Sequence, residues 1–255
     1  MSTAPEPEPA TPPRSVLRRL AELIAPGDWV YRDAHYLVAD VELDPEIAAR
    51  WVPRPLRLAS PARGQVFMAF FPTTTFGSVY REAGVFLDVM HGRRRAVFSP
   101  WMLVDDDVAL ILGREMLGYP KKLGELTWEL DGDRIRATAR RRGHDLLRME
   151  GTLGAPLAAP PPMLGRPHRN LRSTIGVSIP KLIAFTPRER AVSVREARLE
   201  VELGGSERDP LHELGLGRVL GARLHRVDLG GALPPLPVAA VSPLAYARYL
   251  LLRSH

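Results

Sequence analysis

The chain has 255 residues, a formal net charge of +6 and no cysteine. Hydrophobic residues make up 45% and charged residues 25%, which is typical of a globular protein. The absence of cysteine excludes disulfides and thiolate metal sites. No apolar stretch approaches the ~20 residues that a transmembrane helix needs, so we expect no membrane partner.

The chain begins with a segment, residues 1–13, that is rich in proline and glutamate and predicts a disordered tail. This segment lacks the basic and apolar regions of a signal peptide, so we expect a cytoplasmic protein. Ser15 then begins a predicted amphipathic helix, which Pro26-Gly27 ends. We expect residues 14–255 to form a single domain.

Most of the remaining chain consists of short apolar runs that predict strands. These runs are 35–43, 65–71, 85–90, 96–104, 108–112, 126–130, 134–140, 146–153, 182–185, 192–203 and 219–229. Asp131-Gly132-Asp133 predicts a hairpin turn. Short helices are predicted at 46–51 and, after Ser242-Pro243, at 244–252. Many strands without regular helix alternation favour a mainly β (α+β) fold, an antiparallel barrel or sandwich with a few flanking helices.

Two further patterns bear on partners and metals. The arginine triplets 93–95 and 140–142 are typical of solvated strand ends and turns, and no nucleic-acid-binding motif accompanies them, so we expect no nucleic-acid partner. The seven histidines include no pair at the three- or four-residue spacing that places two ligands on one helix face. The sequence therefore predicts no metal site.

Lysine is rare in this chain. Of the 35 basic residues only Lys121, Lys122 and Lys181 are lysines, and the first two are adjacent. A base-composition bias toward arginine would explain the low count, but arginine cannot replace lysine as a nucleophile because its guanidinium stays protonated. An ordinary lysine has a pKa of about 10.4, so a catalytic amine needs burial or a nearby cation to become neutral.

The two adjacent lysines are expected to have different surroundings. If residues 120–123 are extended, successive side chains point to opposite faces, and only one lysine faces a pocket. Burial is then expected to lower the pKa of that lysine more than the charge of its neighbour does. The apolar runs 67–71 and 98–103, which include Phe98 and Met102, are the expected pocket walls. Tyr119 is expected either to wall this pocket or to supply its hydroxyl.

The run Gly113-Arg114-Glu115-Met116-Leu117-Gly118-Tyr119-Pro120-Lys121-Lys122-Leu123-Gly124 resembles the motif of the acetoacetate decarboxylase-like superfamily. The resemblance extends to Val-Pro-Arg-Pro-Leu at 52–56, to Tyr80-Arg81-Glu82 followed by Gly84, and to Leu-Pro-Val at 236–238. It spans nearly the whole folded chain and implies a barrel-like antiparallel sheet in a homo-oligomer.

The resemblance also implies a mechanism. Lys121 matches the Schiff-base nucleophile, Lys122 the neighbouring cation that favours a neutral amine, and Glu82 an active-site glutamate. The implied reaction is imine formation on a small-molecule keto acid, cleavage of a carbon–carbon bond, and hydrolysis. It requires no metal and no organic cofactor. Decarboxylation of a β-keto acid such as acetoacetate is the leading interpretation.

The sequence departs from the family pattern at two positions. Ala34 stands where the decarboxylases carry an arginine, and Val66 where they carry a second glutamate. Arg32 lies two residues before Ala34, so in a regular strand it shares that face and is a candidate substrate-binding residue. These departures keep two alternatives open: an aldolase or dehydratase that uses the same lysine on an α-keto acid plus an aldehyde, and a non-catalytic barrel that binds a small apolar ligand.

Overall fold

The computed structural model describes residues 29–158, 161–173, 179–230 and 235–254. The tail expected at 1–13 and the helix expected after Ser15 lie outside these residues. The described part consists mainly of strands with a few short helices, which confirms the prediction of a mainly β fold.

The strands are β1 (Trp29–Leu43), β2 (Arg57–Leu58), β3 (Arg63–Phe71), β4 (Thr73–Thr74), β5 (Tyr80–His91), β6 (Arg94–Val104), β7 (Lys121–Leu123), β8 (Glu125–Asp131), β9 (Arg134–Arg141), β10 (His144–Pro156), β11 (His168–Arg172), β12 (Lys181–Phe185), β13 (Arg188–Leu203), β14 (Leu216–Gly230) and β15 (Leu236–Ala240). The helices are α2 (Pro45–Ala49), α3 (Asp107–Leu117) and α4 (Pro243–Ser254), and η1 (Leu211–Leu214) is a 3-10 helix.

All of these strands belong to one sheet, in the order β15-β12-β11-β6-β5-β3-β1-β14-β13-β10-β9-β8, with β2, β4 and β7 attached beside this path. Most neighbours are antiparallel, but β6 pairs in parallel with both β7 and β11, so the sheet is mixed. The end strands β15 and β8 do not pair with each other. In the described residues the barrel-like sheet is therefore not closed.

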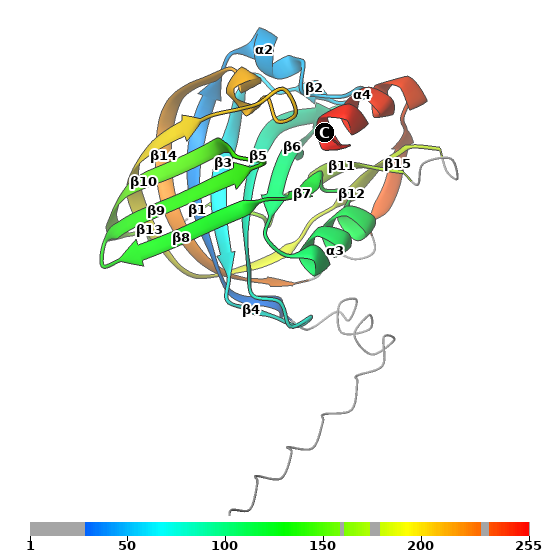
Figure 1. Cartoon of the computed structure of the whole chain (residues 1–255). Helices are drawn as coiled ribbons and strands as arrows, with labels where there is room; N and C mark the ends of the chain where they lie inside the picture. Colours follow the sequence, from blue (N-terminus) through cyan, green and yellow to red (C-terminus); the bar gives the residue numbers. More distant parts are fainter. Residues whose placement is uncertain (1–28, 159–160, 174–178, 231–234, 255) are drawn as a thin grey trace, which may run out of the picture.

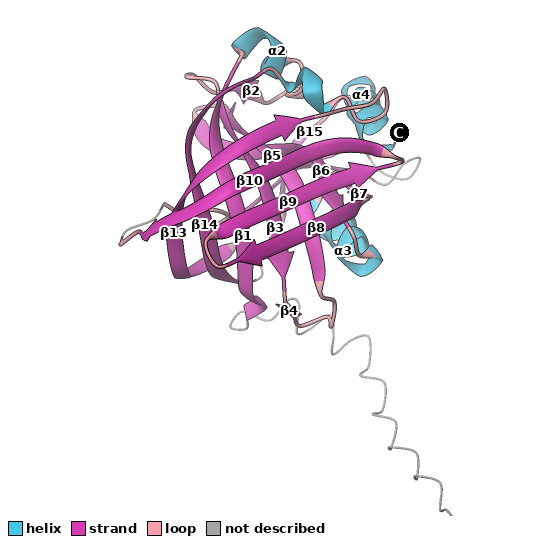
Figure 2. Cartoon of the chain, turned by 60° about the vertical axis from the view of Figure 1, so that its left-hand side comes forward, coloured by secondary structure: helices cyan, strands magenta, loops and turns pink. Residues whose placement is uncertain are grey.

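The sheet curls over on itself. Figures 1 and 2 show β8, β9 and β10 lying across β1 and β3. Buried side chains from both layers fill the space between them, and we call this cluster the large core. It includes Leu37, Val66 and Val85 from one layer and Ile135 and Met149 from the other. Because strand side chains alternate between faces, the intervening residues of β1, β3 and β5 point the opposite way.

Those intervening residues form a second cluster on the outer face of the same strands, which we call the small core. It includes Tyr36, Phe67 and Tyr80, and it is covered by Ala109 of α3 and Leu164 of the segment before β11. The near-continuous apolar runs of β3 and β6 follow from this arrangement, because strands buried on both faces have no solvent side.

One element differs in type from its prediction. Residues 108–112 were predicted as a strand, but they lie in α3 (Asp107–Leu117). The Asp106 carboxylate caps the helix by accepting a hydrogen bond from the Ala109 amide at 2.7 Å. A run of five mostly apolar residues is too short to distinguish a strand from a buried helix by periodicity. The capping aspartate and the terminal Gly118 are the signals that identify the helix.

Candidate active site

The two adjacent lysines lie on β7 and point to opposite sides of the sheet. In the parallel register of β7 with β6, Lys121 pairs with Met102 and Lys122 with Leu103. Met102 belongs to the small core and Leu103 to the large core. Lys121 therefore shares the face of the small core and Lys122 the other face, as the alternation of an extended segment predicts. Each lysine is only 4% exposed.

The turn between α3 and β7 positions Lys121. Gly118 ends α3 in the left-handed conformation (φ 64°), and its amide donates to the Arg114 carbonyl oxygen at 3.1 Å. One turn earlier, Gly113 of α3 packs against the Lys121 side chain. A Cβ atom at Gly113 would lie 2.6 Å from Cδ and Cε of Lys121. The absence of a side chain there leaves the space that the lysine occupies.

Lys121 Nζ forms an ion pair with Glu82 Oε2 at 2.7 Å. Glu82 reaches it because β5, β6 and β7 are neighbours, with Gly84 opposite Met102 and Met102 opposite Lys121. Glu82 lies two residues from Gly84 and thus on the same face. Both partners are buried, Glu82 to 6% exposure. The pair combines an amine and a proton acceptor away from bulk water.

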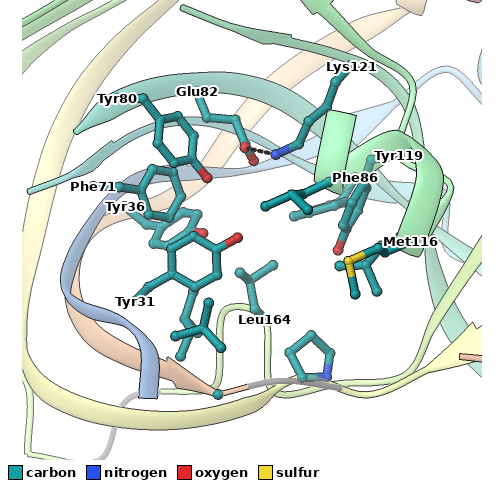
Figure 3. Close-up of a pocket in the computed structure, with 17 residues that line it drawn as sticks. Tyr31, Tyr36, Phe71, Tyr80, Glu82, Phe86, Met116, Tyr119, Lys121 and Leu164 are labelled. Carbon is teal, nitrogen blue, oxygen red and sulfur yellow. Dashed lines mark ion pairs between the residues drawn. The ribbon is translucent and has the colours of Figure 1, made fainter. Parts of the chain in front are cut away.

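A cavity of about 100 Å³ opens beside this ion pair. Glu82 and Lys121 stand at one end, and Tyr31, Tyr36, Phe71 and Tyr80 form one wall, while Phe86, Met116 and Tyr119 form another (Figure 3). The remaining lining residues are apolar or glycine: Val30, Leu112, Gly113, Leu117, Leu164, Pro187, Leu229 and Gly230. Among the described lining residues, Lys121 carries the only basic side chain.

Four tyrosines give the cavity its polar character. Burial, with smaller contributions from the Glu82 carboxylate, raises the pKa of Tyr36 and Tyr119 well above the usual value, and the pKa values of Tyr31 and Tyr80 are raised too. All four hydroxyls therefore stay protonated near neutral pH. The Lys121 amine also lies 5.6 Å from the ring centre of Tyr80 and 6.0 Å from that of Tyr119.

Lys122 is held in a separate buried cluster on the other side of β7. Its amine is paired with Asp209 Oδ1, which also accepts from Trp101 Nε1 at 3.1 Å. The other Asp209 oxygen accepts from Arg141 at 2.7 Å. Burial lowers the pKa of Lys122, and the hydrogen bond from its amine to Asp209 opposes that effect. The Asp209 carboxylate thus compensates the Lys122 charge locally.

Arg32 does not line the cavity, contrary to its expected position on the face of Ala34. It is exposed, while Ala34 is fully buried in the small core. A β-bulge causes the difference: between Tyr31 and Ala34 the register with β14 shifts, and Asp33 has φ 54°. The extra residue reverses the alternation, so Tyr31 occupies the cavity face instead.

Of the other expected wall residues, Tyr119 lines the cavity and Phe98 does not. Phe98 lies in the large core, with its ring centre 5.7 Å from that of Tyr249. Met102 belongs to the small core but is not among the lining residues. A register shift between β5 and β6 inserts one residue between Phe98 and Trp101, so Phe98 and Met102 face opposite ways. Val66 also points into the large core.

Sequence reasoning missed several lining residues. Tyr80 lies two residues before Glu82 in one strand, so alternation alone would have found it. Tyr36 lies two residues after Ala34 and shares its face. No sequence signal pointed to Tyr31, which depends on the bulge, or to Leu164, which lies far from the motif in the chain. The same holds for Asp209, which does not line the cavity but pairs with Lys122. Within the described residues there is no group of three or more histidine, aspartate or glutamate side chains that suits a metal ion.

None of the described helices combines the length and the apolar composition needed to cross a membrane.

A sequence model described as acetoacetate decarboxylase matches residues 11–234. Two curated relatives, both named acetoacetate decarboxylase 1, come from Bradyrhizobium diazoefficiens and Mesorhizobium japonicum. Each is 32% identical, over 108 and 112 residues, which cover 42% and 44% of this chain. The aligned segment spans 43% and 45% of those relatives, less than half of their length.

Solved structures share the fold. The chain superposes on acetoacetate decarboxylase from Legionella pneumophila with a TM-score of 0.73 and 16% identity, covering 94% of this chain and 99% of that one. On an acetoacetate decarboxylase-like enzyme from Sphingomonas wittichii it superposes with a TM-score of 0.67 and 21% identity. That match covers 81% of this chain and 92% of the other. On the enduracididine biosynthesis enzyme MppR, complexed with pyruvate, the TM-score is 0.66 and the identity 16%. That match covers 82% of this chain and 88% of the other. The same enzyme is also solved with the condensation product of pyruvate and imidazole 4-carboxaldehyde, with a TM-score of 0.60 and 15% identity, covering 90% and 95%.

Proposed function

This chain belongs to the acetoacetate decarboxylase family, and we propose that it is a Schiff-base-forming lyase whose nucleophile is Lys121. The observation that carries the proposal is the geometry of Lys121. Its amine is buried, faces a cavity, and lies 2.7 Å from the Glu82 carboxylate. The other lysine of the motif, Lys122, faces away and is paired with Asp209. Only one of the two amines is therefore placed to meet a ligand in the cavity.

In the proposed mechanism Glu82 takes a proton from the Lys121 ammonium, and the neutral amine attacks the ketone carbon of the substrate. The carbinolamine takes up a proton, loses water and becomes a protonated imine. This cation accepts the electron pair of the breaking carbon–carbon bond and becomes an enamine. Protonation of the enamine carbon and addition of water to the imine release the product and return the free amine.

For the substrate we propose a small keto acid, and decarboxylation of a β-keto acid such as acetoacetate as the reaction. The names of the curated relatives support this choice. The mostly apolar lining also supports it, because a carboxylate that leaves as carbon dioxide loses its charge, and exclusion of water disfavours the charged state. The Tyr31 and Tyr36 hydroxyls on one wall are available donors for the carboxylate.

A second candidate reaction, aldol addition with dehydration on an α-keto acid and an aldehyde, is favoured by one observation. Among the described lining residues no arginine accompanies Lys121, and Arg32 is exposed. The described lining thus offers no second cation to orient the carboxylate that a β-keto acid must lose, whereas aldol addition breaks no bond to a carboxylate. The complex of MppR with a condensation product supports the same alternative. A purely ligand-binding protein remains the third interpretation, and it predicts no covalent adduct.

Borohydride trapping tests the proposal. Incubation with pyruvate or acetoacetate and borohydride should attach one reduced adduct to the peptide that contains Lys121, detected by mass spectrometry. Lys121→Arg should abolish the adduct. The matched control is Lys181→Arg, because Lys181 is exposed and lies outside the motif, in β12, and this variant should be trapped normally. Absence of an adduct at Lys121 in the unmodified protein would contradict the proposal and support the binding protein.

Release of carbon dioxide separates the two reactions. If acetoacetate forms the adduct but releases no carbon dioxide above the rate in Lys121→Arg, decarboxylation is excluded and the aldol reaction is favoured. The expected homo-oligomer and cytoplasmic location stay predictions, and sedimentation measures the first of them.

A further inference from the structure

The hydroxyl of Tyr119 is fixed by a buried histidine behind the cavity wall. Tyr119 Oη lies 3.2 Å from Nδ1 of His168, which is fully buried at the start of β11. The His168 ring stacks on Phe185 with a centroid distance of 5.1 Å and meets the edge of Phe86. These contacts hold the imidazole in one orientation, so its hydrogen-bonding pattern is set by the protein.

The second nitrogen of His168 decides the direction of the hydrogen bond to Tyr119. Nε2 lies 3.2 Å from the carbonyl oxygen of Leu164, which can only accept, so Nε2 must carry a hydrogen. Burial, assisted by Arg166, lowers the pKa of His168 to about 3, so the ring is neutral near pH 7. A neutral ring with a hydrogen on Nε2 has a bare Nδ1. Tyr119 therefore donates its hydroxyl proton to His168.

Tyr119 consequently presents acceptor lone pairs, and not its proton, to the cavity. Figure 3 shows its oxygen on the wall opposite Tyr31 and Tyr36. That opposite wall carries the hydroxyls of Tyr31, Tyr36 and Tyr80, whose pKa values are raised by burial, so these hydroxyls keep their protons near neutral pH. The two walls thus differ: one can donate to a ligand oxygen, whereas the Tyr119 side accepts.

The Tyr119–His168 pair does not work as a proton relay. To take a proton from a ligand, Tyr119 would have to pass its own proton to Nδ1 and create a buried imidazolium. Apart from the paired Lys121 and Glu82, the described lining residues carry no charge that would offset it. The pair is therefore a hydrogen bond of fixed direction, and its effect is on which ligand groups bind beside Tyr119.

We propose that Tyr119 determines substrate specificity by accepting a hydrogen bond from the substrate, with His168 as its positioning residue. The preferred substrate is a carbonyl compound that carries a hydroxyl or another neutral hydrogen-bond donor on the side of Tyr119. A carboxylate at that position is disfavoured, because it faces oxygen lone pairs and, among the described lining residues, only Lys121 is basic. The proposal rests on the proposed function only in that Lys121 must bind the carbonyl group.

Ligands matched in shape test the proposal. Hydroxyacetone is paired with butanone, and diacetone alcohol with methyl neopentyl ketone. In each pair a methyl group replaces the hydroxyl. Levulinate supplies a carboxylate. The measurement is the ligand concentration that gives half of the maximal borohydride adduct at Lys121. In the unmodified protein at least one hydroxyl ligand should saturate at a roughly fivefold lower concentration than its methyl partner, as one neutral hydrogen bond allows.

Three variants give the expected pattern. Tyr119→Phe should remove the preference for the hydroxyl ligand while the methyl ketones still form the adduct. His168→Leu should also remove it and should improve levulinate, because Tyr119 regains a proton to donate. His168→Asn should retain the preference, since its side-chain oxygen can replace Nδ1 as acceptor. His225→Asn is the control: His225 is another buried histidine, and it does not line the cavity.

The outcomes separate the two proposals. If butanone and pyruvate give no adduct at Lys121, the Schiff-base function fails. If they do, but neither hydroxyl ligand is preferred, or the preference is the same in Tyr119→Phe, the specificity role of Tyr119 is wrong. A preference that persists in His168→Leu overturns the positioning role of His168 alone.

Discussion

At the scale of single residues, two adjacent lysines have opposite surroundings. Lys121 faces a cavity with one carboxylate partner, whereas Lys122 shares Asp209 with Arg141 and Trp101. The alternation of an extended strand predicts this division once residues 121–123 are taken as extended. The position of Tyr31 could not be predicted in the same way, because a one-residue bulge at Asp33 reverses the alternation and leaves no mark in the sequence.

The cluster around Asp209 gives a prediction about stability. Asp209→Ala leaves two cations without their buried carboxylate, so we expect a loss of about 3–5 kcal/mol in the free energy of unfolding. Urea unfolding measures this loss. The control is Glu42→Gln, which breaks the exposed ion pair with Arg218 at 2.9 Å and should cost less than about 1 kcal/mol. Equal losses in the two variants would show that the Asp209 cluster is not an essential buried ion pair.

At the scale of elements, the motif combines a helix end, a turn and a strand of three residues. Gly118 ends the helix in the left-handed conformation, and Pro120 lies two residues later. The strand β7 then pairs with β6 in parallel. The glycines of the motif were visible in the sequence, but their partners were not. Only the structure places Gly113 against the Lys121 side chain. The strand predicted for 108–112 was wrong because its apolar residues are equally suited to a helix packed on the small core.

Gly113 provides a test of this packing. Gly113→Ala raises the helix propensity of α3 by about 1 kcal/mol, yet the new methyl group would lie 2.6 Å from the Lys121 side chain. We expect adduct formation to slow by roughly tenfold or more, because small displacements of a reacting group are costly. The measurement is the rate of borohydride trapping.

The control for Gly113→Ala is Gly132→Ala in the β8–β9 turn. Gly132 has φ 58°, and nothing lies within 4 Å of a Cβ atom placed there. This variant should lose about 1 kcal/mol of stability through backbone strain and keep the normal trapping rate. If Gly113→Ala traps at the normal rate as well, the helix does not position the lysine.

At the scale of the whole molecule, one curled sheet carries a core on each face. The abundance of short apolar runs predicts a strand-rich fold, and the family resemblance implies its barrel-like shape. The extent of closure could not be predicted, because it depends on pairings between distant strands such as β1 with β14. The strands β11 and β15 were also missed. Most residues of β11 are polar, and β15 contains a proline, so neither shows the apolar pattern of a strand.

Two buried histidines make the stability of the whole molecule depend on pH. Burial lowers the pKa of His168 to about 3 and that of His225 to about 4. Below the unfolded value of about 6.5 the unfolded chain binds protons that the native protein does not. Stability is therefore unaffected by these groups above pH 6.5 and falls as the pH drops toward 4, by at most about 1.4 kcal/mol per pH unit for each histidine.

Urea unfolding at a series of pH values measures this dependence. His168→Asn and His225→Asn should each flatten the slope between pH 6 and 4, whatever their effect at pH 7. His212→Asn is the control, because His212 is exposed, and its slope should match that of the unmodified protein. An unchanged slope in both buried variants would mean that these histidines do not remain neutral in the native state.

The opposite orientation of the two lysines has a consequence for covalent ligands. A backbone strand separates the two amines, although they belong to consecutive residues. A carbonyl reagent that enters the cavity meets the amine of Lys121 alone, while Asp209 and Trp101 occupy the side of Lys122. A covalent inhibitor with a carbonyl group is therefore expected to react with Lys121 and not with Lys122. The orientation of the backbone accounts for this selectivity.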